Sequence, residues 1–180
     1  VIVSLLDHLG IEGADLVGIS YGGIIAHELA ALHAGRVNRL AILASPGRSY
    51  TPDDHRALLD RFAVADAGEL LLPRTPDAVQ TLLELGYHKP PRTPRWVQGQ
   101  VLRAMYSQFR AEKAALLENL LDELQRLHAR PGEVDHQTLL IWGEHDPVFP
   151  VEIGRRLQAD MGGRARLRIV ERAGHAPNLE

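Results

Sequence analysis

Short apolar runs recur along the chain, separated by longer stretches in which apolar residues have helical spacing. Four of the runs predict buried strands, at about residues 14–19, 38–44, 138–142 and 165–170. Apolar residues at helical spacing predict a helix over residues 1–9, which ends at Gly10. The same spacing predicts another helix directly after the first strand, from residue 24. Strands that alternate with helices predict the α/β class, with a parallel sheet flanked by helices.

The stretch between the second and third predicted strands, about residues 46–136, has a different pattern of apolar residues and contains no convincing buried strand. Helical runs are predicted near residues 52–66, 76–86, 94–109 and 111–129, with prolines between them at Pro73, Pro76, Pro90, Pro91 and Pro94. The pattern therefore predicts an incomplete α/β core, residues 1–47 and 134–180. An all-helical cap, residues 48–133, is inserted between its second and third strands.

Residues 18–22 read Gly-Ile-Ser-Tyr-Gly and connect the first predicted strand to the helix that follows it. This is the strand, tight turn and helix of a nucleophile elbow, with Ser20 as the exposed nucleophile. Because the turn strains the serine backbone and leaves no room for flanking side chains, we expect Gly18 and Gly22 to supply that room. The backbone N–H of Tyr21, at the helix N-terminus, is the expected oxyanion donor.

The partners of such a serine are expected downstream, first an acid and then a histidine, on loops after later strands. Asp146 follows the third apolar run and His175 follows the fourth, and we interpret them as the acid and the base. The imidazole would take the serine proton during attack, and the carboxylate would hold the imidazole in one tautomer. Two neighbours compete for these roles, His145 as the base and Glu144 as the acid.

Three segments of the chain resemble the α/β-hydrolase family: residues 18–22, residues 142–147 (Trp-Gly-Glu-His-Asp-Pro) and residues 174–177 (Gly-His-Ala-Pro). They occur in the family's order across nearly the whole chain. The serine at the elbow implies a serine hydrolase, because the related dehalogenases and epoxide hydrolases carry an aspartate there. The resemblance aligns Asp146 with the triad acid. No cofactor is implied, since water is the second substrate and the protein supplies the other groups. The remaining histidines show no shared spacing of the H-E-x-x-H kind, so we expect no metal site.

By the same resemblance, the chain looks like a fragment of a longer enzyme. Only 19 residues precede Ser20, where related hydrolases have several strands and a loop that carries the second oxyanion donor. The chain also stops at Glu180, before the usual last helix. We therefore expect the first strand to present an unpaired apolar edge, and the isolated chain to be poorly soluble and nearly inactive.

The predicted cap is similar to that of monoacylglycerol-lipase-like hydrolases in residues 71–76 and 87–91. This similarity implies a carboxylic ester hydrolase that acts on medium or long acyl chains, such as monoacylglycerols. Related enzymes with the same triad open lactones or cleave carbon–carbon bonds, and others have lost catalysis and bind ligands, so these alternatives stay open. Trp96 and Met105 are candidates for the side of the cap that faces the serine, although apolar cap residues more often form the cap's own core.

The composition is that of a globular protein and excludes several functions. The 180 residues include no cysteine, which rules out disulfides, thiolate catalysis and cysteine metal sites. The net charge of −3 and the scattered arginines give no reason to expect nucleic acid. No apolar stretch approaches the ~20 residues of a membrane span, and no signal peptide is visible. We expect a small-molecule ester and water as partners and a cytoplasmic location, with the oligomeric state left open.

Overall fold

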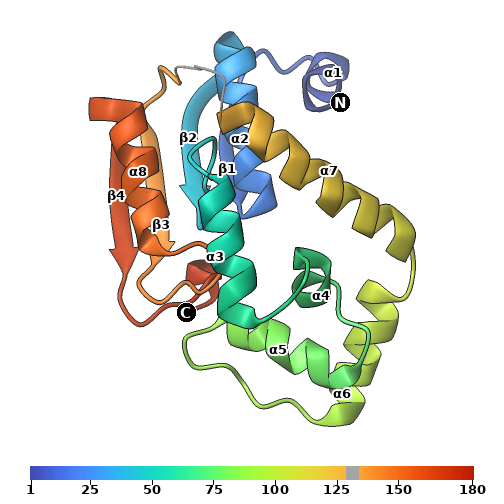
Figure 1. Ribbon diagram of the computed structural model, residues 1–180. Coiled ribbons are helices and arrows are strands. Elements are labelled where there is room, and N and C mark those ends of the chain that lie inside the picture. Colours follow the sequence, from blue (N-terminus) through green and yellow to red (C-terminus); the bar gives the residue numbers. More distant parts are fainter. Residues whose placement is uncertain (129–133) are drawn as a thin grey trace.

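Four parallel strands form the centre of the structure, a computed structural model that describes residues 1–128 and 134–180. In order across the sheet they are β1 (Ala14–Ile19), β2 (Val37–Leu43), β3 (Thr138–Gly143) and β4 (Ala165–Val170). The predicted α/β class is confirmed, and the strand bounds differ from the expected ones by at most one residue. Because each pair of neighbours is parallel, the carboxyl ends of all the strands meet at one edge of the sheet (Figure 1).

Helices cover one face of this sheet. After α1 (Ile2–His8), which leads into β1, α2 (Tyr21–Leu32) packs on β1 and β2, and α8 (Val151–Met161) packs on β3 and β4. Alternate strand residues point toward these helices, and Ile42, Leu140 and Trp142 are completely buried in the main core. Short 3₁₀ turns lie before β2 and β4 and near the end of the chain, at Ala34–Arg36, Gly162–Arg164 and Pro177–Leu179.

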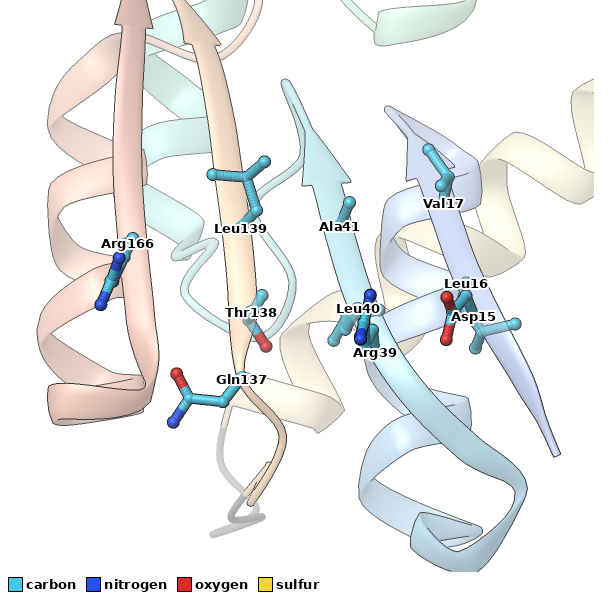
Figure 2. Close-up of a pocket in the computed structure, with 10 residues that line it drawn as sticks. All are labelled: Asp15, Leu16, Val17, Arg39, Leu40, Ala41, Gln137, Thr138, Leu139 and Arg166. Atoms are coloured by element: carbon cyan, nitrogen blue, oxygen red, sulfur yellow. The ribbon is translucent and has the colours of Figure 1, made fainter.

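The other face of the sheet is open. Figure 2 shows a hollow along it, near the amino ends of the strands and therefore at the opposite end from Ser20. Its lining residues are Asp15, Leu16, Val17, Arg39, Leu40, Ala41, Gln137, Thr138, Leu139 and Arg166. Within the described sheet β1 pairs only with β2, and Val17 on this edge strand is 76% exposed.

A group of helices connects β2 to β3 at the carboxyl edge of the sheet (Figure 1). They are α3 (Pro52–Phe62), α4 (Ala67–Leu71), α5 (Pro76–Gly86), α6 (Arg95–Val101), the π-helix η2 (Leu102–Tyr106) and α7 (Arg110–His128). Side-chain oxygens of Thr51, Asp66 and Thr75 cap the first three of them. None of the described helices combines the length and the apolar character of a membrane span. The expected ends of the last helical run and of the cap, at 129 and 133, lie outside the described residues.

Two of the predicted helical runs are divided in the structure. The run at 52–66 ends at Phe62, because Ala63 adopts a left-handed φ of 50° and a separate helix begins after Asp66. The run at 94–109 passes from α6 into η2, and Phe109, at φ 54°, separates it from α7. The sequence does not reveal these breaks, because alanine and phenylalanine are not residue types that mark a helix end.

The helices between β2 and β3 share an apolar cluster with the loop that follows β3. Leu58, Leu70 and Leu85, from α3, α4 and α5, are buried together with Val148 from that loop. Helix α7 joins the main core of the sheet instead. The contacts attach these helices to the carboxyl edge of the sheet, and a separate cap domain with bounds 48–133 stays a prediction.

An ion pair ties α2 to the loop after β2. The Nε and Nη2 atoms of Arg48 donate to the two carboxylate oxygens of Glu28, at 2.5 and 3.0 Å. Burial raises the pKa of Glu28, but the contacts with His27 and Arg48 outweigh it and lower the pKa to about 2. The helix that begins at the elbow is therefore held in place by a charged carboxylate.

Glu28→Gln is expected to lower the free energy of unfolding by about 2–3 kcal/mol at pH 7. A carboxyl whose pKa is lowered by folding stabilises the folded state above its unfolded pKa, and this contribution is lost as the pH falls from about 5 to about 2. Urea denaturation of wild type and variant should therefore converge over that range. Asp53→Asn, which breaks an exposed ion pair with Arg56, is the control and should change stability by about 0.5 kcal/mol or less. A loss in Glu28→Gln that did not depend on pH would contradict the ion pair as its cause.

Candidate active site

Ser20 stands in a strained turn between β1 and α2. Its backbone adopts φ 49° and ψ −119°, a conformation that costs a non-glycine residue about 1–3 kcal/mol. Backbone hydrogen bonds hold it there: the Ser20 N–H donates to the Leu43 carbonyl at 2.9 Å, and the Ser20 carbonyl accepts from the N–H groups of Gly23 at 2.9 Å and Ile24 at 3.4 Å. The neighbouring strand and the new helix together fix the hydroxyl at the carboxyl edge of the sheet.

The glycines around this turn differ in how much room they need. A Cβ at Gly18 would lie 2.3 Å from the Gly22 carbonyl oxygen, and a Cβ at Gly23 would lie 2.4 Å from the Ser45 side chain. A Cβ at Gly22 would meet nothing within 4 Å, so the expected need for space at Gly22 is not found. The residue that must lack a side chain is Gly23 instead. Sequence reasoning missed it, although the pair of glycines at positions 22 and 23 was an available signal.

The side chains of Ser20, His175 and Asp146 form one hydrogen-bonded row. Ser20 Oγ lies 3.0 Å from His175 Nε2, and His175 Nδ1 lies 2.9 Å from Asp146 Oδ2. With its proton on Nδ1, the imidazole donates to the carboxylate and accepts from the hydroxyl. The Asp146 side chain is completely buried, and that of His175 is 17% exposed. Each residue follows the carboxyl end of a different parallel strand, which explains why positions so distant in sequence meet.

Asp146 is oriented by backbone donors of its own loop. Its Oδ1 accepts from the N–H groups of Val148 and Phe149, both at 2.9 Å, and this leaves Oδ2 for the imidazole. The His145 N–H donates to the Ala173 carbonyl at 2.9 Å, which joins the loop of the acid to the loop of the histidine. The carboxylate therefore cannot turn without breaking several bonds.

Phe149 packs against the imidazole and belongs to a set of aromatic neighbours that sequence reasoning missed. Its ring lies edge-on to His175, with centroids 5.5 Å apart, and edge-on to Tyr50 at 5.4 Å. The Trp142 indole N–H donates to the Phe149 carbonyl at 2.7 Å, so the buried strand β3 fixes this loop. Burial, together with the nearby charge of Asp54, raises the pKa of the Tyr50 phenol, which keeps the hydroxyl neutral.

His145 and Glu144, the competing base and acid, lie apart from the row. His145 Nε2 is 3.4 Å from Glu144 Oε2, and both side chains are nearly half exposed. The His145 ring also stacks on His88, with centroids 4.3 Å apart. In the part of the chain that the structure describes, no hydrogen bond joins either side chain to Ser20. The geometry therefore favours Asp146 and His175 for the two roles.

An apolar cavity of about 150 Å³ lies beside Ser20. Its lining combines the serine, Tyr21 and His175 with mainly apolar side chains from α2, α3, α4, α7 and two loops, namely Ile24, Tyr50, Leu58, Leu71, Leu117, Leu120, Leu121, Leu124, Val148 and Phe149. None of these described lining residues is Asp, Glu, Lys or Arg. The cavity suits an uncharged group attached to the reacting carbon.

Trp96 and Met105 do not line this cavity, contrary to expectation. They are 67% and 58% exposed and lie on the outer side of α6 and η2. The inner side of α6 carries Gln98, which is buried and donates to the Thr93 carbonyl at 2.8 Å. Helical spacing identifies the apolar positions, but it does not show which side of a helix faces the serine.

Tyr21 remains the candidate for one oxyanion donor. It is the first residue of α2, so its N–H has no acceptor within the helix and lies at the positive end of the helix dipole. It also follows Ser20 directly, next to the point where an attacked carbonyl would develop negative charge. The second donor, expected upstream, stays a prediction.

Comparison with known proteins identifies the family. The alpha/beta hydrolase family matches residues 1–180, and the chain belongs to it. The chain is 32% identical over 192 residues to the 2-hydroxymuconate semialdehyde hydrolase of Pseudomonas sp. (strain CF600), with 99% of this chain and 61% of that protein aligned. It is 29% identical over 168 residues to a pimeloyl-[acyl-carrier protein] methyl ester esterase of Neisseria meningitidis, with 92% of this chain and 64% of that protein aligned.

A solved structure agrees on the fold. A serine hydrolase from the polyaromatic-hydrocarbon-degrading bacterium Cycloclasticus zankles superposes with a TM-score of 0.77 at 19% identity, covering 99% of this chain and 62% of that one. The chain thus spans less than two thirds of the length of these relatives. The two sequence relatives are named for different substrates, a semialdehyde and a methyl ester, and the substrate of this chain is a matter for proposal.

Proposed function

We propose that this chain carries the catalytic centre of a serine hydrolase that cleaves carboxylic esters through an acyl-enzyme intermediate on Ser20. The observation that carries the proposal is the row from Ser20 Oγ to His175 Nε2, at 3.0 Å, and from His175 Nδ1 to Asp146 Oδ2, at 2.9 Å. A serine hydroxyl is a weak nucleophile at neutral pH, and this row supplies the base that activates it. A pure ligand-binding protein would need none of the three groups.

In the first half of the proposed reaction, Ser20 Oγ attacks the ester carbonyl carbon while its proton passes to His175 Nε2. The Tyr21 N–H stabilises the developing oxyanion, and Asp146 stabilises the imidazolium. The bond to the alcohol oxygen then breaks, His175 returns the proton to that oxygen, and the acyl group stays on the serine. In the second half, water gives a proton to His175 and attacks the acyl carbon. The carboxylic acid leaves and the serine hydroxyl is restored.

The cavity supports an apolar acyl group as the part of the substrate nearest the serine. Most of the residues that line its 150 Å³ are aliphatic or aromatic, and none of the described lining residues is Asp, Glu, Lys or Arg. Each methylene buried in such a lining contributes about 0.8 kcal/mol to binding. A medium or long acyl chain, as in a monoacylglycerol, suits this lining better than a charged or strongly hydrated group.

Carbon–carbon bond hydrolysis is the second candidate. The relative at 32% identity is named for 2-hydroxymuconate semialdehyde, which carries a carboxylate. A carboxylate in an apolar site needs a cationic or strongly donating partner, and none of the described residues that line the cavity is Lys or Arg. The electrostatics of the cavity therefore favour the ester over this alternative.

Two measurements on the natural polypeptide that carries these residues test the proposal. A fluorophosphonate probe reacts with activated serines and is expected to label Ser20. Esters of p-nitrophenol with graded acyl chains are expected to be hydrolysed, with kcat/KM rising from acetate to medium chain lengths. A protein that is labelled but hydrolyses no ester of any length would refute ester hydrolysis and favour carbon–carbon cleavage. An unlabelled protein would favour a ligand-binding homologue.

Leu117→Trp is expected to shorten the acyl chain that the enzyme prefers. Leu117 lines the cavity from α7, and an indole in its place would fill part of the 150 Å³. Overpacking of this kind costs about 1–3 kcal/mol, so kcat/KM for the octanoate ester should fall about 10- to 100-fold while that for the acetate ester stays nearly unchanged. Ala115→Trp, at an exposed position of the same helix, is the control and should leave both esters unaffected. Equal losses on both esters in Leu117→Trp would argue against an acyl group in this cavity.

A further inference from the structure

The loop that carries His175 is hydrogen-bonded to helix α5 as well as to the loop that follows β3. The Ala176 N–H donates to the Gly86 carbonyl at 2.8 Å, and the His175 N–H donates to the Leu85 carbonyl at 3.3 Å. Both acceptors lie in the last turn of α5, where carbonyls have no donor within the helix. The backbone of the histidine is thus fixed to the end of α5.

At Gly174 the histidine loop lies so close to the end of α5 that there is no room for a side chain. A Cβ at Gly174 would lie 2.8 Å from the Gly86 carbonyl oxygen and 2.8 Å from the Tyr87 carbonyl carbon. Both neighbours are backbone atoms, which cannot move aside as the tip of a side chain can. The residue before His175 therefore packs directly on the turn that follows α5.

Glu180 joins the same two segments through its side chain. Its Oε2 accepts from the Gly174 N–H at 2.7 Å and from the His88 N–H at 2.9 Å, and its Oε1 accepts from the Lys89 N–H at 3.4 Å. Partial burial raises the pKa of Glu180, but these backbone donors outweigh it and hold the pKa below its usual range. One charged carboxylate therefore bridges the histidine loop and the turn after α5.

We propose that Glu180 is a positioning residue for His175, because its carboxylate holds Gly174 against the turn at residues 87–89. The inference rests on the proposed function, since it concerns the base of the triad. Without the carboxylate the Gly174 N–H loses its acceptor, and the segment before His175 can shift relative to Ser20. A displacement of about 1 Å at a reacting group can cost about 100-fold in rate.

Three variants of the natural polypeptide test this inference. Glu180→Ala removes the acceptor, and kcat is expected to fall about 10- to 100-fold while KM changes less than about twofold. Glu180→Gln keeps an oxygen that can accept from Gly174 and His88, so it should recover most of the lost kcat. Glu144→Ala is the matched control, because Glu144 also accepts an N–H of the histidine loop, from Arg172 at 3.0 Å, without bridging to the turn. Its kcat should stay within about twofold of wild type.

Further readouts separate positioning from stability. In Glu180→Ala the Tm and the fraction of sites titrated by fluorophosphonate should stay near wild type, while the low-field proton resonance of the His175 Nδ1–H should shift or broaden. Unchanged kcat in Glu180→Ala, a Glu180→Gln variant as slow as Glu180→Ala, or a loss explained wholly by unfolded protein would overturn the inference.

The experiments distinguish a failure of the proposed function from a failure of the positioning role of Glu180. A wild-type protein that neither reacts with the probe nor hydrolyses esters would refute that function, and the His175 resonance would then decide on Glu180 alone. A resonance that changes in Glu180→Ala would support the positioning role, and an unchanged one would overturn it.

Discussion

Ser20→Ala is expected to lower kcat for ester hydrolysis by about 10⁴- to 10⁶-fold and to abolish labelling by fluorophosphonate. The variant keeps the cavity, the Tyr21 N–H and the His175–Asp146 pair, but it lacks the oxygen that would carry the acyl group. Its Tm should stay close to that of wild type, because alanine meets the same backbone strain at φ 49° as serine does. Steady-state rates on p-nitrophenyl octanoate, measured together with thermal melts, check both expectations.

Ser107→Ala is the control for this variant, because the exposed Ser107 hydroxyl lies just after η2, away from Ser20 in sequence, and donates to the Leu102 carbonyl at 3.0 Å. It should retain full activity and full labelling. His175→Ala should cost about as much as Ser20→Ala, and the double variant hardly more, since groups that act as a unit are not additive. A Ser20→Ala protein with kcat within about 100-fold of wild type would contradict the role given to Ser20.

The meeting of Ser20, Asp146 and His175 could be predicted because each follows an apolar run, and those runs define the strands nearly to the residue. Residues that follow the carboxyl ends of parallel strands lie along one edge of the sheet, whatever their separation in sequence. The elbow had a further signal in Gly18, where a Cβ would lie 2.3 Å from backbone. Local sequence was therefore sufficient to bring these three side chains to one edge of the sheet.

The surroundings of these groups could not be predicted, because they depend on which face of each helix points toward Ser20. Trp96 and Leu71 are both apolar residues of the inserted helices, yet Trp96 is 67% exposed and Leu71 lines the cavity. The difference comes from tertiary contacts such as those of buried Gln98, and apolar spacing does not contain them. The bridge made by Glu180 is similar, since its partner His88 lies 92 positions away in sequence.

Asp146→Asn is expected to lower kcat by about 10⁴-fold while the fold stays intact. The asparagine oxygen can still accept from the N–H groups of Val148 and Phe149, which Asp146 Oδ1 now accepts at 2.9 Å. The amide NH₂ would then replace Oδ2 opposite His175 Nδ1 and donate to it, so the imidazole proton would move to Nε2. A protonated Nε2 cannot accept the Ser20 proton, and the base is lost although every backbone contact remains.

Two comparisons isolate this effect. Asp146→Ala also removes the acceptor for the N–H groups of Val148 and Phe149, and each buried donor left unpaired lowers the free energy of unfolding by about 1–3 kcal/mol. The Tm of Asp146→Ala should therefore fall, whereas that of Asp146→Asn should not. Glu144→Gln alters the neighbouring carboxylate, which is nearly half exposed and contacts His145, and kcat should stay within about twofold of wild type. A larger loss in Glu144→Gln than in Asp146→Asn would make Glu144 the acid. The histidine would then have to leave the hydrogen bond at 2.9 Å that now orients it.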